Sequence, residues 1–211
     1  TTAALNAMGS DSVAALGADL AKLDTNALGA LTTDNLSGLT TDAAVALTSQ
    51  QLSALAQNAT GLSTSALAAL TTRNLSGLDS AAVAAMTSDQ VAALDSDVTG
   101  LSSSAIAAFN SINVAGLTTS ALAAMSVAQV ELLGDSAIGL TTDGLDALTA
   151  TNISGITTKA ISLLSSDQVA ALGADAAALG SDDLAAMTSV NIYGLTTDAV
   201  QALYSEQVAA L

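Results

Sequence analysis

The chain repeats itself from end to end with a period of 39 residues. Three residue types recur at this spacing, each in a fixed register. They form a Gln series (Gln51, Gln90, Gln129, Gln168, Gln207), an Asn series (Asn35, Asn74, Asn113, Asn152, Asn191) and a Gly series (Gly38, Gly77, Gly116, Gly155, Gly194). Independent residue types do not keep one register by accident of composition. A fixed period of this size is typical of a solenoid, in which each repeat packs on its neighbours.

Each repeat divides further into one segment of seven residues and four segments of eight. The sequence therefore predicts one repeat domain, 1–211, in which a 39-residue coil has five short sides. Its parts are two octads (1–16) followed by coils 17–55, 56–94, 95–133, 134–172 and 173–211. We expect the series of Gln, Asn and Gly to form structural ladders from coil to coil.

The octads carry the residues that begin helices. Their first place is Thr, Ser, Asn, Gly or Asp, which are preferred N-cap residues, and Thr87 with Gln90 has the capping-box spacing. The fifth and eighth places are apolar, which predicts that they point inward. A continuous helix is excluded, because eight residues advance it by about 800°, so that the apolar stripe would wander round the helix. The pattern predicts a helix of one or two turns that restarts at each octad.

We therefore expect an all-α solenoid of very short helices. Two alternatives are a β-solenoid and a HEAT-like array of longer paired helices. The segments Asn35–Gly38 and Asn74–Gly77 resemble pieces of pentapeptide-repeat β-helices, but apolar spacings of three and five do not match the period of two that strands need. The Gly series is expected at tight corners, where a Cβ would clash or φ is positive. The Asn series is expected to cap those corners or to form an amide ladder.

Composition argues against several functions. The formal charge is −16, with Lys22, Arg73 and Lys159 against 19 acidic residues. Such a surface repels nucleic acid and anionic lipid. The chain contains no His and no Cys, which removes the common general base and the thiolate nucleophile, so we expect no enzyme, no catalytic residue and no cofactor. The uncharged stretch 98–130 is broken by polar residues, so no membrane span is expected.

Calcium is the one ion that the acidic residues suggest. Asp19, Asp97 and Asp175 occupy equivalent places in alternate repeats, with Asn58 and Ser136 between them. Carboxylate oxygens suit calcium, so these three are candidate surface ligands. Because the acids alternate with neutral residues, a dense calcium cage is not expected. Among the cations, the 39-residue spacing predicts ion pairs between coils, Asp34 with Arg73 and Lys159 with Asp198.

Threonines also recur, and they have two interpretations. One series is Thr32, Thr71, Thr149 and Thr188, and the other is Thr41, Thr119, Thr158 and Thr197. These hydroxyls are either helix caps or the regular face of a lattice-binding module that meets ice or a repetitive glycan.

Leu117-Thr118-Thr119 and the segment Ser166–Leu172 resemble the LTTxQVAAL tandem arrays of very large bacterial secreted surface proteins. The resemblance implies a secreted or surface-bound repeat region that serves as a scaffold, stalk or matrix polymer. We therefore expect an extracellular or cell-surface bacterial protein that forms a filament, sheath or adhesin stalk, and a stretch of a longer chain. Its partner is expected to be another copy of itself, by end-to-end stacking of solenoids that lack polar caps, or else a surface glycan.

Overall fold

The computed structural model describes residues 2–211, whose regular elements are all helices, with no strand among those residues. The expected all-α solenoid of very short helices is confirmed, and the β-solenoid and the HEAT-like array of long helices are wrong. The chain divides into two compact units, one through Ala108 and one from Phe109 to Leu211. Each unit is described separately.

The first unit contains α-helices (α) and 3₁₀ helices (η) of four to seven residues. They are α1 (Thr2–Asn6), α2 (Ser10–Leu16), η1 (Gly17–Lys22), α3 (Thr25–Leu28), α4 (Thr33–Leu36), α5 (Thr41–Ala46), α6 (Ser49–Ala54), η2 (Ala56–Gly61), α7 (Thr64–Leu67), α8 (Thr72–Leu75), α9 (Ser80–Ala85), α10 (Ser88–Leu94), η3 (Asp95–Gly100) and α11 (Ser103–Ile106).

The second unit continues the same pattern. Its elements are η4 (Asn113–Gly116), α12 (Thr119–Ala124), α13 (Val127–Leu132), η5 (Gly134–Gly139), α14 (Thr142–Asp146), η6 (Ile153–Gly155), α15 (Thr158–Leu163), α16 (Ser166–Ala171), η7 (Gly173–Ala178), α17 (Ser181–Ala185), η8 (Ile192–Gly194), α18 (Thr197–Ala202) and α19 (Ser205–Val208).

Side-chain caps keep the octad helices short. In α10, the Thr87 hydroxyl accepts a hydrogen bond from the Gln90 backbone N–H (3.2 Å), and the Gln90 side-chain oxygen accepts one from the Thr87 N–H (3.1 Å). Thr87 has extended backbone angles (φ −75°, ψ 162°), and so does Leu47 at the end of α5 (φ −66°, ψ 138°). Where extended residues such as these interrupt the helices, the chain bends before the next helix begins.

The seven-residue segments behave differently, and the expectation of a cap at every segment is wrong for them. The Leu that precedes each of these segments makes no side-chain cap, and the first residue of each segment has positive φ: Gly17 (50°), Ala56 (47°), Asp95 (42°), Gly134 (53°) and Gly173 (53°). A 3₁₀ helix follows at once from the preceding α-helix. Since a 3₁₀ helix has fewer residues per turn than an α-helix, the missing residue is absorbed without a gap.

One turn of the solenoid contains three segments, so the predicted five-sided coil is wrong. In the first unit α5 packs on η1, α9 packs on η2 and α10 packs on α7. In the second unit α15 packs on η5 and α16 packs on α14. In each pair the later element is the third segment after the earlier one, which corresponds to 23 or 24 residues. The 39-residue repeat is a pattern of residue types over five segments, whereas the turn is set by the bend at each segment.

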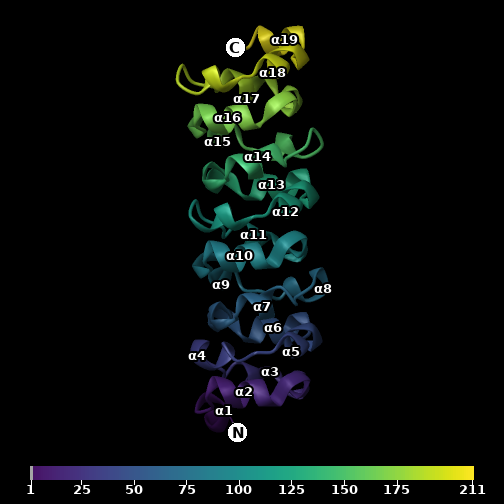
Figure 1. The fold of residues 1–211 in the computed structure, drawn as a ribbon, viewed down its shortest axis with the longest axis vertical. Helices are drawn as coiled ribbons and strands as arrows, with labels where there is room; N and C mark the ends of the chain where they lie inside the picture. The colour runs from purple at the N-terminus through teal and green to yellow at the C-terminus, as the bar shows by residue number, and fades with distance from the viewer. Residues whose placement is uncertain (1) are drawn as a thin grey trace. The chain divides into compact units, whose positions relative to one another are not determined.

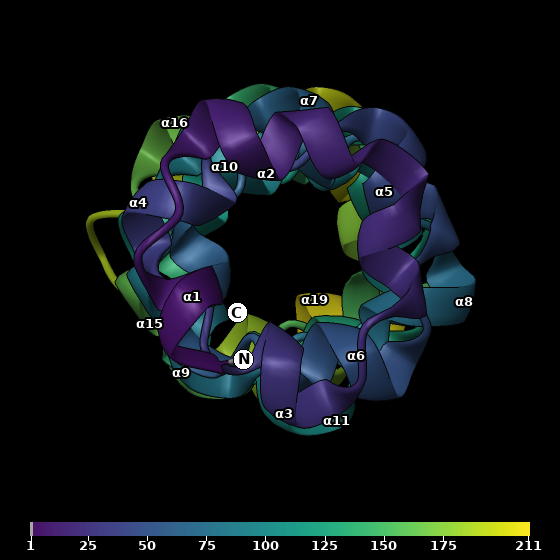
Figure 2. The same ribbon diagram turned by 90° about the horizontal axis from the view of Figure 1, so that it is seen from below.

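Figure 1 shows the segments of the first unit, from purple to teal, stacked in tiers. Seen from below, the purple segments α1–α5 run round a ring (Figure 2). Side chains fill the space inside it: Leu52, Leu55, Leu67 and Leu70, at the fifth and eighth places, are at most 1% exposed. The fourth place is buried as well, by Ala in several segments (Ala43, Ala66, Ala82) and by Asn or Gln in others.

Replacement of Ala56 by Gly should stabilise the first unit. Its φ of 47° is a conformation that side chains with a Cβ rarely adopt. Ala56→Gly should raise the free energy of unfolding by about 1 kcal/mol, since relief of backbone strain exceeds the entropy that Gly adds to the unfolded chain. Urea unfolding followed by circular dichroism measures the change.

Gly17→Ala is the matched control, because it introduces a Cβ at the equivalent position, where no atom lies within 4 Å of it. It should destabilise the unit by a similar amount. If neither variant changed the free energy of unfolding, this would contradict backbone strain at these positive-φ positions.

Candidate functional site

Each Asn of the series ties its own turn to the one before it. Asn74 is the last residue but one of α8 and is buried, at 2% exposure. Its side-chain oxygen accepts a hydrogen bond from the Thr71 N–H (2.9 Å), while its Nδ2 donates to the carbonyls of Ala44 and Leu47 (both 3.2 Å) at the end of α5. One amide therefore caps the start of its own helix and also satisfies two main-chain carbonyls at the end of a helix in the preceding turn. The bonds go to main-chain carbonyls, and not to the amide of another Asn.

Other members of the series make the same bonds. Nδ2 of Asn35 donates to Leu5 and Asn6, that of Asn152 to Leu122 and Met125, and that of Asn191 to Ile161 and Leu164. Asn113 is buried and accepts from the Asn110 N–H (2.9 Å). No buried side-chain N or O atom among residues 2–211 lacks a hydrogen-bond partner, so this interior polar network is satisfied.

The Gln series closes the ends of the seven-residue segments. Gln90 Nε2 donates to the main-chain carbonyl oxygens of Thr60 (2.8 Å) and Leu62 (3.1 Å) at the end of η2. The other pairs are Gln51 with Ala21 and Leu23, Gln168 with Ile138 and Leu140, and Gln207 with Ala177 and Leu179. The side chains of Asn74, Asn152 and Asn191 donate to carbonyls of eight-residue segments, whereas each of these Gln side chains donates to carbonyls of a seven-residue 3₁₀ segment. The extra methylene of Gln matches the segment that is one residue shorter.

The Gly series lies where two turns approach closely. A Cβ built on Gly38, Gly77, Gly155 or Gly194 would fall on the backbone carbonyl of Ser10, Ser49, Val127 or Ser166, respectively. Of the two reasons expected for these glycines, the steric one is right and positive φ is wrong. A second set, Gly61, Gly100 and Gly139, makes similar approaches to Thr33, Thr72 and Ser111. Sequence reasoning missed it because Lys22 and Ala178 interrupt that register.

The candidate calcium ligands are engaged in other contacts. Asp97 accepts a hydrogen bond from the Thr72 N–H (2.8 Å), Asp175 accepts one from the Ala150 N–H (3.0 Å), and Asp19 forms an ion pair with Lys22 (2.6 Å). Asp19 and Asp97 belong to segments ten apart, which is not a multiple of three, so they do not stack. Residues 2–211 contain no group of three or more His, Cys, Asp or Glu side chains that could hold a metal. Calcium binding at these residues stays a prediction.

The Thr series do not form a flat face within either unit. Thr32 and Thr71 are five segments apart in the first unit, and Thr149 and Thr188 are five apart in the second. Because a turn takes three segments, neither pair stacks. Thr32 instead caps α4, where its hydroxyl accepts from the Asn35 N–H (3.4 Å). The helix-cap interpretation fits this geometry, and the stacked array required for lattice binding does not.

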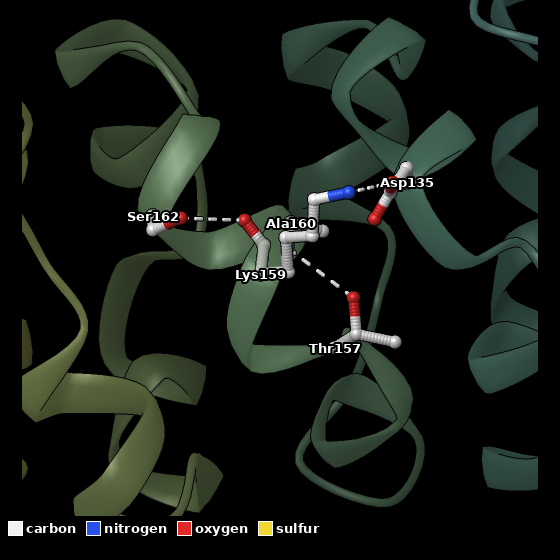
Figure 3. A network of polar contacts seen from close by, with 5 residues as sticks. All are labelled: Asp135, Thr157, Lys159, Ala160 and Ser162. Atoms are coloured by element: carbon white, nitrogen blue, oxygen red, sulfur yellow. Dashed lines mark hydrogen bonds and ion pairs between the residues drawn. The ribbon is translucent and has the colours of Figure 1, made fainter.

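Two of the three cations are paired, though not as predicted. Lys159 pairs with Asp135, three segments earlier, rather than with Asp198 (Figure 3). In the same view Thr157 caps α15 at the Ala160 N–H (3.2 Å). A hydrogen bond to Asp19 raises the pKa of Lys22. The predicted pair between Asp34 and Arg73 is not formed, and within the described chain no carboxylate pairs with Arg73.

Among residues 2–211, no helix has the length and apolar character that a membrane span requires.

Comparison with known families identifies the repeat itself. Residues 61–96 and 176–211 each match the model of the ALTTAQ repeat. The chain therefore carries tandem repeats of the kind that the LTTxQVAAL resemblance implies. Searches of curated proteins and of solved structures gave no match.

Asn74→Asp tests the buried amide. The variant keeps the shape of the side chain but directs a carboxylate oxygen at the carbonyls of Ala44 and Leu47. It should lose about 3 kcal/mol at neutral pH. Burial raises the folded-state pKa of the new carboxyl above its unfolded value of about 3.9, so the penalty should be smallest below that pH and should grow as pH rises. Urea unfolding at a series of pH values measures it.

Asn26→Asp is the matched control in the same unit. Asn26 is exposed on α3, so the same chemical change should cost less than about 1 kcal/mol. Equal losses in both variants would contradict a special role for the Asn series.

Gly77→Ala tests the close approach of turns. The added methyl would meet the backbone of Ser49, which cannot move without shifting α6. We expect a loss of about 2–4 kcal/mol. Gly9→Ala, where the methyl would meet no atom within 4 Å, should be nearly neutral in the same thermal melt. A neutral Gly77→Ala would show that the turns are not held at this distance.

Proposed function

We propose that this chain is a spacer in an extracellular filament, sheath or adhesin stalk of a bacterium. Its character as a structural repeat protein rests on the ALTTAQ matches. The observation that carries the proposal is the buried amide of the Asn series, which binds carbonyls of the preceding turn. Secretion and surface location rest on the resemblance to bacterial surface arrays.

The amides specify the register of stacking. A slip by one segment would place the Ala of the fourth place opposite the carbonyls that Asn74 closes. Those buried carbonyls would then lack a donor, which costs about 1–3 kcal/mol each. Because every turn contacts only its neighbours, such a solenoid can lengthen by repetition without a new topology. These are the properties that a spacer of defined length needs.

The acidic surface supports the same role. A net charge of −16 opposes side-by-side aggregation of copies. A chain without His or Cys is also better suited to a scaffold than to catalysis.

Self-association is supported by the last turn of the second unit. Val200 and Val208 occupy the fifth place, which is buried in other segments, yet they are 46% and 50% exposed, and Leu211 is 44% exposed. A further turn of the repeat, from the same chain or from a second copy, would cover them.

Electron micrographs of the purified chain test end-to-end stacking. Particles should lengthen with concentration, because each junction buries apolar side chains of the last turn. Val208→Glu should leave single particles, since it places a charge in the junction. Leu163→Glu is the matched control, because Leu163 is 54% exposed at the seventh place of its segment, and it should still lengthen. Compact particles of one size at every concentration would contradict stacking.

A further inference from the structure

We propose that Arg73 and the hollow beside it bind a carboxylate-bearing ligand of about monosaccharide size, a sugar acid. Two adjoining pockets, each of about 310 Å³, flank Arg73 in the first unit. Both are lined by Val45, Leu47, Arg73 and Asn74. Thr71 and Thr72 complete one of them, and Ala46, Thr48 and Ser49 complete the other. This volume lies at the lower end of the range of small-molecule sites, roughly 300–1,000 Å³.

The pocket is formed where the repeat departs from its own pattern. Arg73 is the one arginine of the sequence, and the equivalent places in other repeats carry Asp34, Ile112, Thr151 and Val190. Val45 also stands alone, because the equivalent places carry Ala84, Ala123, Ser162 and Gln201. The two residues are 28 apart in sequence and line the same pocket because α8 begins a little more than one turn after the end of α5.

Arg73 is free to bind an anion. Lys22 and Lys159 each pair with a carboxylate, whereas within residues 2–211 no carboxylate pairs with Arg73, which is exposed. A guanidinium presents two parallel N–H donors that match a carboxylate. Asp97 lies at the same corner, where it accepts from the Thr72 N–H (2.8 Å). Its charge opposes an anionic ligand, so we expect affinity in the millimolar range.

The rest of the pocket suits the body of a sugar. Val45 is 59% exposed and offers an apolar surface against which the C–H face of a pyranose can pack. The hydroxyls of Thr72 and Ser49 form no hydrogen bond within the described chain, whereas that of Thr48 is used as a helix cap. Cation, apolar surface and free hydroxyls together indicate a polyhydroxylated carboxylate, either free or as a unit of an acidic polysaccharide.

The single arginine provides its own reporter, because Arg73 gives the one arginine side-chain Nε–H signal in a ¹⁵N-labelled sample. Sodium glucuronate, titrated at constant ionic strength, should shift this signal and the backbone amides of Val45 and Thr72 with saturation near about 1–10 mM. Glucose at equal concentration should not. A short oligogalacturonate should bind the same residues if the source is a polysaccharide, and only the monosaccharide acid should bind if it is not.

Variants separate the site from general electrostatics. Arg73→Gln should weaken glucuronate binding at least tenfold, read from the amides of Val45 and Thr72, while Lys22→Gln should leave it unchanged. Val45→Ala should weaken glucuronate several-fold and leave acetate unaffected. Shifts that do not saturate, equal shifts with glucose, or equal binding by Arg73→Gln would overturn the proposal.

Discussion

The structure depends on a carboxamide that makes two kinds of bond at once. In Asn74 the oxygen completes the cap of its own helix, and the nitrogen closes two carbonyls of the preceding turn. Helices of three to seven residues are too short to be stable alone. They persist because they pack against segments three places away in the chain, and because side-chain caps such as that of Thr87 hold the starts of many octad helices. A polar group buried at this position is stabilising only when all its bonds are made, as they are here.

The solenoid class, the segment lengths and the inward apolar places could be read from the sequence because they are local. Caps such as Thr87 act over three residues, and the pairing of apolar places acts within one segment. The number of segments per turn could not be read in this way. It depends on the bend angle between segments, which no residue type encodes, and the 39-residue period suggested a turn of five segments when the turn is three.

The same error explains which parts of the candidate sites were wrong. Partners such as Asp34 with Arg73, and columns such as Thr32 with Thr71, were inferred from a spacing of 39, whereas contacts between turns join residues 24 to 30 apart. The Asn, Gln and Gly series were identified correctly as special, since each is fixed by contact with the backbone of another turn. The role of the fourth place was missed because Ala there looks unremarkable until its burial is known. The positive φ of Ala56 and Asp95 has no signal in those residue types.

The mismatch between a five-segment pattern and a three-segment turn has a geometric consequence for any long array of these units. From one repeat to the next, a residue that recurs every 39 residues is rotated by one third of a turn about the solenoid axis. It returns to its first angular position only after three repeats. Residues that recur once per repeat, such as the Asn and Gln series, are therefore distributed helically and not along one side. Within such a unit, a residue type that recurs with the repeat therefore gathers on no single face to which a neighbour could adhere.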